Sequence, residues 1–233
     1  MINVQSEPIL MKSKKRVQEH GEVFTPGWVI DKMTAIPEIN EKIEDVYATF
    51  LEPSAGEGAF LLAIENLKFQ FIEEKYNKDL WDTYALWALT SLYGIEYLED
   101  NLSIARRNMF DLFLRYYEKI YNASLSVKSD LYKSAQTIIR ANVIQGNTLT
   151  HRNNYGEEII FSNWVQVPDD IYKVHRIPFA YSSLFSDKSD GNKIVYIQES
   201  LFDVFEQVEY TIPLSGYAVV NINQVWKEEK ENV

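Results

Sequence analysis

Two glycines and an acidic residue lie close together in the segment FLEPSAGEGAFLL, residues 50–62. An apolar entry, a turn of small residues and a second apolar run are typical of a strand, a tight turn and a helix. Gly56 and Gly58 let the backbone turn sharply and approach a ligand closely, because neither carries a Cβ atom. In an open α/β sheet such a turn lies at the carboxyl end of a strand, where ligands bind.

The same turn lacks the features of two common phosphate-binding loops. A dinucleotide-binding turn requires a third small residue, and the corresponding position here is Leu61. No Gly-Lys-Ser or Gly-Lys-Thr sequence follows, so the turn is not a P-loop. Glu52 at its entrance repels polyphosphate and favours a ligand with an amine or a positive charge. The alternative is an ordinary strand-to-helix turn without a ligand.

Two further polar residues come at the ends of predicted strands. Glu96 ends a strand that we expect to begin near residue 92, and its carboxylate can accept hydrogen bonds from both hydroxyls of a ribose. Asn147 follows a strand expected at residues 141–145, and its amide can hydrogen-bond the edge of an adenine. Together with Glu52, these residues predict a pocket for an adenosine that carries a cationic tail.

The elements that must position these residues alternate between strand and helix through the first two thirds of the chain. This alternation predicts a largely parallel sheet covered by helices. Thr25 can cap a helix that begins at Pro26, and Pro37 ends or interrupts that helix. We expect strands at residues 48–51, 92–96, 141–145, 158–162, 172–181, 193–200 and 216–225, and helices at 59–76, 80–91, from 100 and at 201–210.

Composition excludes several kinds of chemistry. The chain of 233 residues has no cysteine, which excludes disulfides, thiolate nucleophiles and cysteine-based zinc sites. Its three histidines lack the spacing of metal ligands, so we expect no metal. There is neither an apolar segment of signal-peptide length nor a run of about 20 apolar residues that would span a membrane. We therefore expect a cytoplasmic protein.

The formal net charge of −11 disfavours unaided binding of nucleic acid, which usually requires a basic face. Residues 1–19 are the local exception and are expected to form a basic arm; as an alternative, this arm is only a solvated terminal segment. Its basic residues are Lys12, Lys14, Lys15 and Arg16.

The order of these motifs resembles that of the S-adenosylmethionine-dependent DNA adenine-N6 methyltransferases of restriction-modification systems, particularly their methylation subunits. The sequence HGEVFTP at residues 20–26 is similar to the family's motif before the first strand. LEPSAGEGAFL at 51–61 resembles its cofactor motif DPxxGxGxFL, with Glu52 in place of Asp. GIEYLEDNLSIARRNM at 94–109 is similar to its ribose-binding strand and helix, and NVIQGNTL at 142–149 resembles its third motif, with Asn147 where Asp is usual.

The resemblance implies a single methyltransferase-like domain at residues 20–233, with S-adenosylmethionine as its cofactor. The implied α/β fold is Rossmann-like, a mostly parallel seven-stranded sheet with helices on both faces. Thr25 and Pro26 would close over the cofactor. The residues that would line it are Glu52, Ser54, Ala55, Gly56, Gly58, Glu96 and Asn147.

The family's catalytic motif, Asp or Asn followed by Pro-Pro and an aromatic residue, is absent from the chain. Alignment of the expected fourth strand places Asn163 at the polar position, followed by Trp164. In the family's mechanism a flipped adenine stacks on the aromatic residue while the polar side chain holds its amine. Asn163 can accept from that amine and Trp164 can supply an aromatic face. In the alternative, Trp164 packs within a structural turn and no methyl transfer occurs.

We therefore expect a DNA adenine-N6 methyltransferase of restriction-modification or phage type. The alternative is a catalytically inactive, methyltransferase-like regulatory, assembly or anti-restriction protein. The segment after Asn163 is too short to include a target-recognition region, so DNA recognition is expected to need a specificity subunit or another partner protein.

Overall fold

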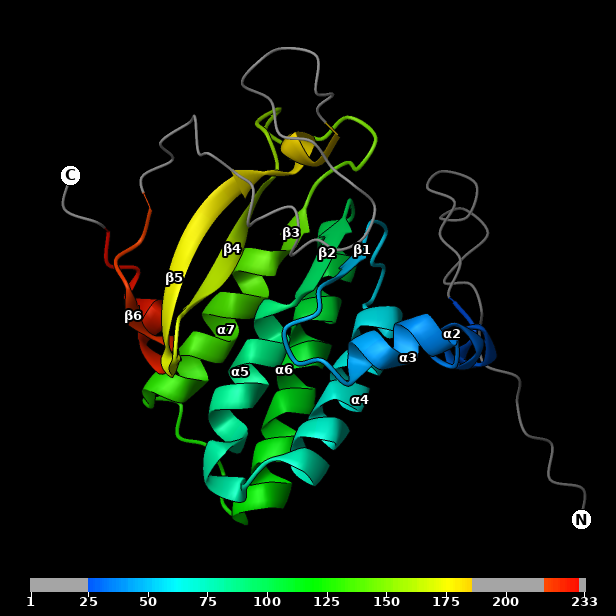
Figure 1. The fold of residues 1–233 in the computed structure, drawn as a ribbon. Coiled ribbons are helices and arrows are strands. Elements are labelled where there is room, and N and C mark those ends of the chain that lie inside the picture. Colours follow the sequence, from blue (N-terminus) through cyan, green and yellow to red (C-terminus); the bar gives the residue numbers. More distant parts are fainter. Residues whose placement is uncertain (1–24, 186–215, 231–233) are drawn as a thin grey trace, which may run out of the picture.

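The computed structural model describes residues 25–185 and 216–230, which form two separate three-stranded sheets and a group of helices (Figure 1). The strands are β1 (Phe50–Glu52), β2 (Leu92–Glu96), β3 (Val143–Gln145), β4 (Ile160–Val167), β5 (Asp170–Ala180) and β6 (Val220–Asn221). The helices are α2 (Gly27–Thr34), α3 (Pro37–Ile43), α4 (Ala59–Lys75), α5 (Trp81–Thr90), α6 (Glu99–Tyr121) and α7 (Asp130–Asn142). Short 3₁₀ helices are η1 (Lys78–Leu80), η2 (Tyr181–Phe185) and η3 (Ile222–Lys227).

The first sheet is parallel, with β2 in the centre. Phe50 of β1 pairs with Leu92, and Gly94 pairs with Val143 of β3. Helices α4 and α5 connect β1 to β2, and α6 and α7 connect β2 to β3. All three strands therefore end at the same edge of the sheet, here called the carboxyl edge (Figure 1).

Helices α4 to α7 pack against one another and against one face of the parallel sheet. Their core is aromatic, and the ring of Phe69 contacts the rings of Trp81, Phe113 and Tyr116. Edge-to-face contacts of this kind add about 0.5–1.5 kcal/mol per pair to the effect of burial. The expected helices at 59–76, 80–91 and from residue 100 are confirmed as α4, α5 and α6.

The opposite face of the parallel sheet packs on the second sheet. Tyr93 and Ile95 alternate with the helix-facing residues of β2, because successive side chains of a strand point to opposite faces. They are buried against Phe161 of β4 and Phe179 of β5. The parallel sheet thus lies between the helices and the antiparallel β4–β5 hairpin.

The expected seven-stranded, mostly parallel sheet with helices on both faces is wrong. In the described residues only β1, β2 and β3 are parallel, and β4 pairs with β5 in antiparallel orientation. The reason is a two-residue turn, Pro168–Asp169, between the paired residues Val167 and Asp170. A turn of this length joins antiparallel strands, whereas a parallel connection needs a crossover of about a dozen residues.

Some of the other expected helices and strands are confirmed, and others are wrong or lie outside the described residues. Pro37 does interrupt the first helix, since α2 ends at Thr34 and α3 begins at Pro37. The strand expected at 172–181 is confirmed as β5, except that Tyr181 begins η2. The strand expected at 216–225 is mostly wrong, because β6 covers two residues and η3 follows it. Helix α7 was not expected. The basic arm, the strand at 193–200 and the helix at 201–210 lie outside the described residues.

Candidate ligand site at the carboxyl edge of the parallel sheet

The Glu96 carboxylate joins the end of β2 to the glycine turn after β1. Its Oε2 accepts a hydrogen bond from the Gly56 backbone N–H at 2.7 Å, and its Oε1 accepts one from the Leu98 N–H at 2.9 Å. Gly56 adopts φ 55°, a left-handed conformation that glycine reaches at low cost. Glu96 is only 6% exposed. Two of the predicted ligand-binding elements are therefore brought together.

Close packing holds this turn against the sheet and against α6. The Ala55 N–H donates to the Ile95 carbonyl at 2.9 Å. Gly58 has φ 86°, and a Cβ atom built on it would lie 3.0 Å from the Ala105 Cβ of α6. Only a glycine allows this approach without displacing α6.

Gly94, in the middle of β2, was not recognised as part of the site. A Cβ atom on Gly94 would lie 2.8 Å from Leu61 Cδ1, so this glycine gives α4 its close approach to the sheet. In a dinucleotide-binding turn, the third small residue allows the same close approach of helix and strand. In this protein the small residue is on the strand and not on the helix. The signal was a glycine inside an apolar strand, which often marks such an approach.

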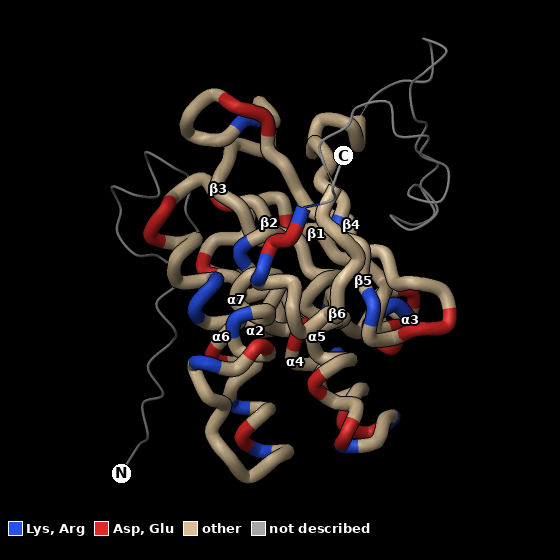
Figure 2. Tube along the Cα trace, turned by 90° about the vertical axis from the view of Figure 1, so that its left-hand side faces the viewer, with Lys and Arg blue, Asp and Glu red and all other residues tan. Residues whose placement is uncertain are grey.

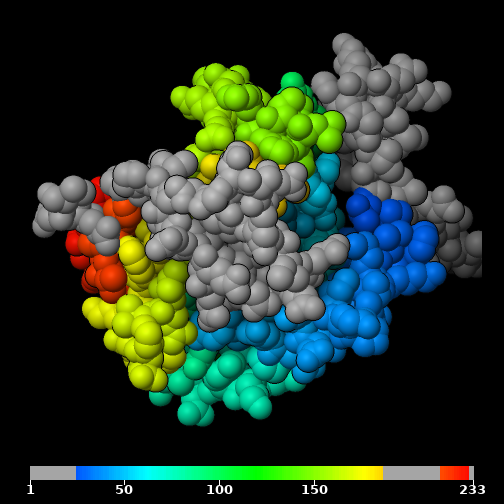
Figure 3. Space-filling model, turned by 45° about the horizontal axis from the view of Figure 1, so that its top comes forward, coloured from blue at the N-terminus to red at the C-terminus, as the bar shows by residue number. Residues whose placement is uncertain are grey.

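Asn147 lies in the loop after β3 and uses its side-chain oxygen within that loop. Its Oδ1 accepts from the backbone N–H groups of Leu149 at 2.9 Å and Thr150 at 3.2 Å. The Thr148 hydroxyl donates to the Pro53 carbonyl, which ties this loop to the turn after β1. Figure 3 shows the yellow-green loop projecting beside the cyan residues of that turn. The Asn147 amide Nδ2 donates to no other residue in the described part.

Glu52 ends β1 at the same edge and is half-buried. Burial raises the pKa of its carboxyl, and a hydrogen bond from the Ser54 N–H acts in the opposite direction. A carboxylate in this position gains more from a cationic ligand than an exposed one, because desolvation disfavours the unpaired charge. Ser54 is exposed and Ala55 is buried beside it.

Thr25 and Pro26 precede α2. Pro26, in extended conformation, occupies the N-cap position, so the expectation that Thr25 caps a helix beginning at Pro26 is wrong by one residue. No described hydrogen bond links either residue to Glu52, Glu96 or Asn147. Their closure over a ligand stays a prediction.

Asn163 and Trp164 lie at the other edge of the parallel sheet. The Trp164 Nε1 donates to Asn142 Oδ1 at 2.9 Å, and Asn142 Nδ2 donates to the Thr90 carbonyl at 2.9 Å. Asn142 and Thr90 come just before β3 and β2, so this chain of bonds marks the amino-terminal edge. Both Asn163 and Trp164 are buried, at 7% and 5% exposure.

Asn163 borders a cavity of about 10 Å³ together with Thr49, Ser91 and Trp164. Its Nδ2 is buried and has no hydrogen-bond partner within the described residues. A cavity of this size accommodates about one water molecule. The structure therefore does not bring Asn163 and Trp164 together with the residues of the carboxyl edge, because β4 runs opposite to β1–β3.

The fold and site define an α/β protein with a strand, glycine turn and helix facing a buried carboxylate. Comparison of the chain with known protein families, with curated proteins and with solved structures found no match. Within the described ranges, no group of three or more His, Asp or Glu side chains is arranged to hold a metal ion. In the same ranges, none of the helices has the length and apolar character needed to cross a membrane.

Proposed function

We propose that the protein binds S-adenosylmethionine at the carboxyl edge of the parallel sheet and acts as a methyltransferase-like protein without transferring the methyl group. The observation that carries this proposal is the Glu96 carboxylate, placed against the Gly56 N–H. A carboxylate offers about four lone-pair positions. The two backbone N–H groups use one on each oxygen, which leaves one on each for the two hydroxyls of a ribose.

Two other groups at this edge support an adenosine ligand with a positive charge. The Asn147 Nδ2 is a donor that suits an acceptor nitrogen of adenine. Glu52 supplies a half-buried carboxylate toward which a sulfonium or amino group is attracted. Glu52 and Asn147 end or follow the two strands that flank β2, so the three groups lie in a row along one edge.

The position of Asn163 and Trp164 argues against methyl transfer by these residues. Strand β2 has five residues, and its two ends are about 13 Å apart at about 3.3 Å per residue. Methyl transfer requires the reacting atoms to approach within about 3–3.5 Å. Trp164 also uses its indole N–H to hold Asn142. We therefore favour a regulatory, assembly or anti-restriction role, with any contact to DNA made through a partner protein.

Replacing Glu96 with Gln is expected to weaken S-adenosylmethionine binding by about 1–3 kcal/mol, because a charged acceptor for the ribose hydroxyls is lost. Isothermal titration calorimetry measures this difference directly. Glu99→Gln is the matched control, since Glu99 is exposed on α6 three residues away and its replacement changes the charge equally. Circular dichroism of Glu96→Gln checks that the turn still folds.

Two results would contradict the binding site. Folded wild-type protein that gives no heat of binding at about 1 mM S-adenosylmethionine would exclude it. Equal affinity of Glu96→Gln and Glu99→Gln would show that the ligand binds elsewhere.

We expect no transfer of a tritiated methyl group from S-adenosylmethionine to adenine-containing DNA, with or without a specificity subunit. The measurement is radioactivity retained on DNA, compared with an active adenine methyltransferase under the same conditions. Transfer that disappears in Asn163→Ala but persists in Asn154→Ala, an exposed asparagine in the loop before β4, would restore the enzyme hypothesis.

A further inference from the structure

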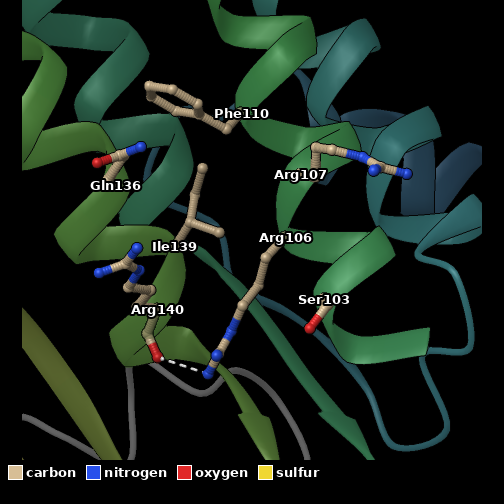
Figure 4. Close-up of a pocket in the computed structure, with 7 residues that line it drawn as sticks. All are labelled: Ser103, Arg106, Arg107, Phe110, Gln136, Ile139 and Arg140. Atoms are coloured by element: carbon tan, nitrogen blue, oxygen red, sulfur yellow. Dashed lines mark hydrogen bonds between the residues drawn. The ribbon is translucent and has the colours of Figure 1, made fainter. Parts of the chain in front are cut away.

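Three arginines line a cavity between α6 and α7 in a chain whose formal net charge is −11. The cavity measures about 300 Å³, and Figure 4 shows the side chains around it. Figure 2 shows Lys and Arg positions gathering where α6 and α7 run side by side. The lining residues are Ser103, Arg106, Arg107 and Phe110 of α6 and Gln136, Ile139 and Arg140 of α7.

Arg106 is held in a fixed orientation. Its Nε donates to the Val143 carbonyl at 2.7 Å, and its Nη2 donates to the Arg140 carbonyl at 3.3 Å (Figure 4). A guanidinium has five N–H donors, so three remain after these two bonds. Because the group is anchored, it loses little conformational entropy when it binds a ligand.

The charges of Arg106 and Arg140 are not compensated within the described residues. Burial lowers the pKa of the Arg106 guanidinium, and the charge of Arg140 lowers it further. A guanidinium nevertheless stays protonated in proteins. No ion pair involves Arg106, Arg107 or Arg140 in residues 25–185 and 216–230. An anion between Arg106 and Arg140 would relieve their repulsion.

We propose that this cavity binds a phosphate group between Arg106 and Arg140. A phosphate ester with a free terminal group carries about −1.5 to −2 charges at pH 7, which matches two guanidinium groups better than the single charge of a carboxylate does. The Ser103 hydroxyl and the Gln136 amide are neutral donors at the same cavity. Arg107 extends away from the other two arginines and adds only to the local field (Figure 4).

The remaining walls are apolar. Phe110 and Ile139 border the cavity and suit the organic part of a phosphorylated ligand. The same phosphate chemistry has two possible sources, a small phosphorylated molecule or the backbone of a nucleic acid. The site does not depend on S-adenosylmethionine binding, since Arg106 is anchored at Val143, the first residue of β3 and not its carboxyl end.

Titration with pyrophosphate at low salt, followed by calorimetry, tests the site. Wild-type protein is expected to bind with a Kd of about 1 mM or lower, and Arg140→Gln is expected to bind at least about tenfold more weakly. The Arg140 side chain donates no described hydrogen bond, so this variant should fold. Arg115→Gln is the matched control, because Arg115 is exposed on α6 outside the cavity. Arg106→Lys keeps the charge but loses the planar fork, and it should also bind more weakly.

A short single-stranded DNA oligonucleotide separates the two sources. If Arg140→Gln weakens oligonucleotide binding and lowers its salt slope by about 1, the site contacts a backbone phosphate. If pyrophosphate binds and the oligonucleotide does not, the ligand is a small phosphorylated molecule. The proposal is overturned if neither probe binds, or if Arg140→Gln and Arg115→Gln lose affinity equally.

Discussion

Replacing Lys68 with Met lowers the free energy of unfolding by about 3–5 kcal/mol, the largest loss that we expect from a single substitution in this chain. Lys68 is fully buried on α4. Its Nζ donates to the carbonyls of Asp45 at 2.8 Å, Val46 at 3.0 Å and Ala48 at 2.7 Å, and to Ser91 Oγ at 2.9 Å. Met preserves the apolar stem but leaves three carbonyls without this donor, at about 1–3 kcal/mol each where they stay buried.

The position of Lys68 explains why this loss should reach the ligand site. Residues 45–48 lead into β1, and Ser91 immediately precedes β2. By binding both segments, the ammonium group fixes the amino ends of the two strands and so favours the pairing of Phe50 with Leu92. Burial lowers the pKa of Lys68 to about 7, whereas the charge of the Asp45 carboxylate acts in the opposite direction.

Urea denaturation followed by circular dichroism measures the effect of Lys68→Met. Lys75→Met is the control, because Lys75 is exposed at the end of the same helix. Its stability should stay within about 0.5 kcal/mol of the wild type. Equal stability of the two variants would mean that the carbonyls find water or other donors when Lys68 is removed.

Patterns of a few neighbouring residues were enough to predict those parts of the candidate site that belong to one strand and the turn after it. The glycine turn at 56–58 and the strand ending at Glu96 were recognised because their signals extend over only a few residues. Asn147 was also placed correctly after a short strand. These three meet at one edge because parallel strands end together, which needs only the correct order of elements.

The direction of β4 was predicted wrongly, although the two-residue turn Pro168–Asp169 was visible in the sequence. The expected strand ended at Ser162, four residues before the last pairs of the real hairpin, so the turn was not read as a hairpin turn. That error moved Asn163 from the amino-terminal edge to the carboxyl edge. A residue at the end of a strand can therefore be assigned to one edge of the sheet only when the direction of that strand is known.

The two buried charged residues of α4 were not predicted either. Glu65 and Lys68 look like the polar face of a surface helix, because nothing local distinguishes them from exposed positions. Their burial results from the packing of α5 and α6 against α4 and from the segment before β1. Burial of these two residues depends on tertiary contacts, and the spacing of apolar residues along a single helix does not reveal those contacts.

Glu65→Met is expected to raise the free energy of unfolding at pH 7 by about 1–3 kcal/mol, because it removes a buried polar group with no compensating bond. Glu65 is completely buried, and neither carboxyl oxygen has a hydrogen-bond partner among the described residues. Burial raises the pKa of this carboxyl well above its ordinary value, while the charge of Arg115 on α6 acts in the opposite direction. Met has a similar length and fills the same space without needing a partner.

The pH dependence separates this explanation from a simple packing effect. With its pKa raised, folded Glu65 keeps its proton at pH values where the unfolded chain has lost it, so the folded state binds more protons. Stability therefore falls as pH rises above about 4.3, the ordinary pKa of Glu. Glu65→Met lacks this contribution, and its advantage over the wild type should grow from pH 4 to pH 7. Urea denaturation at both pH values, with exposed Glu74→Met as the control, measures the difference.

A loss of stability in Glu65→Met at pH 7 would contradict this account and would mean that the carboxylate has a partner that stabilises its charge. The affinity of the same variant for S-adenosylmethionine then shows whether the change in stability affects ligand binding. Glu65 is fully buried and lies near Arg115 in the second half of α6, whereas α6 begins at the carboxyl edge, so a more stable variant should bind the ligand with wild-type affinity. Reduced affinity in a more stable protein would instead show that the glycine turn at the start of α4 must move to admit the ligand, and that an unpaired carboxyl in this helix keeps it able to do so.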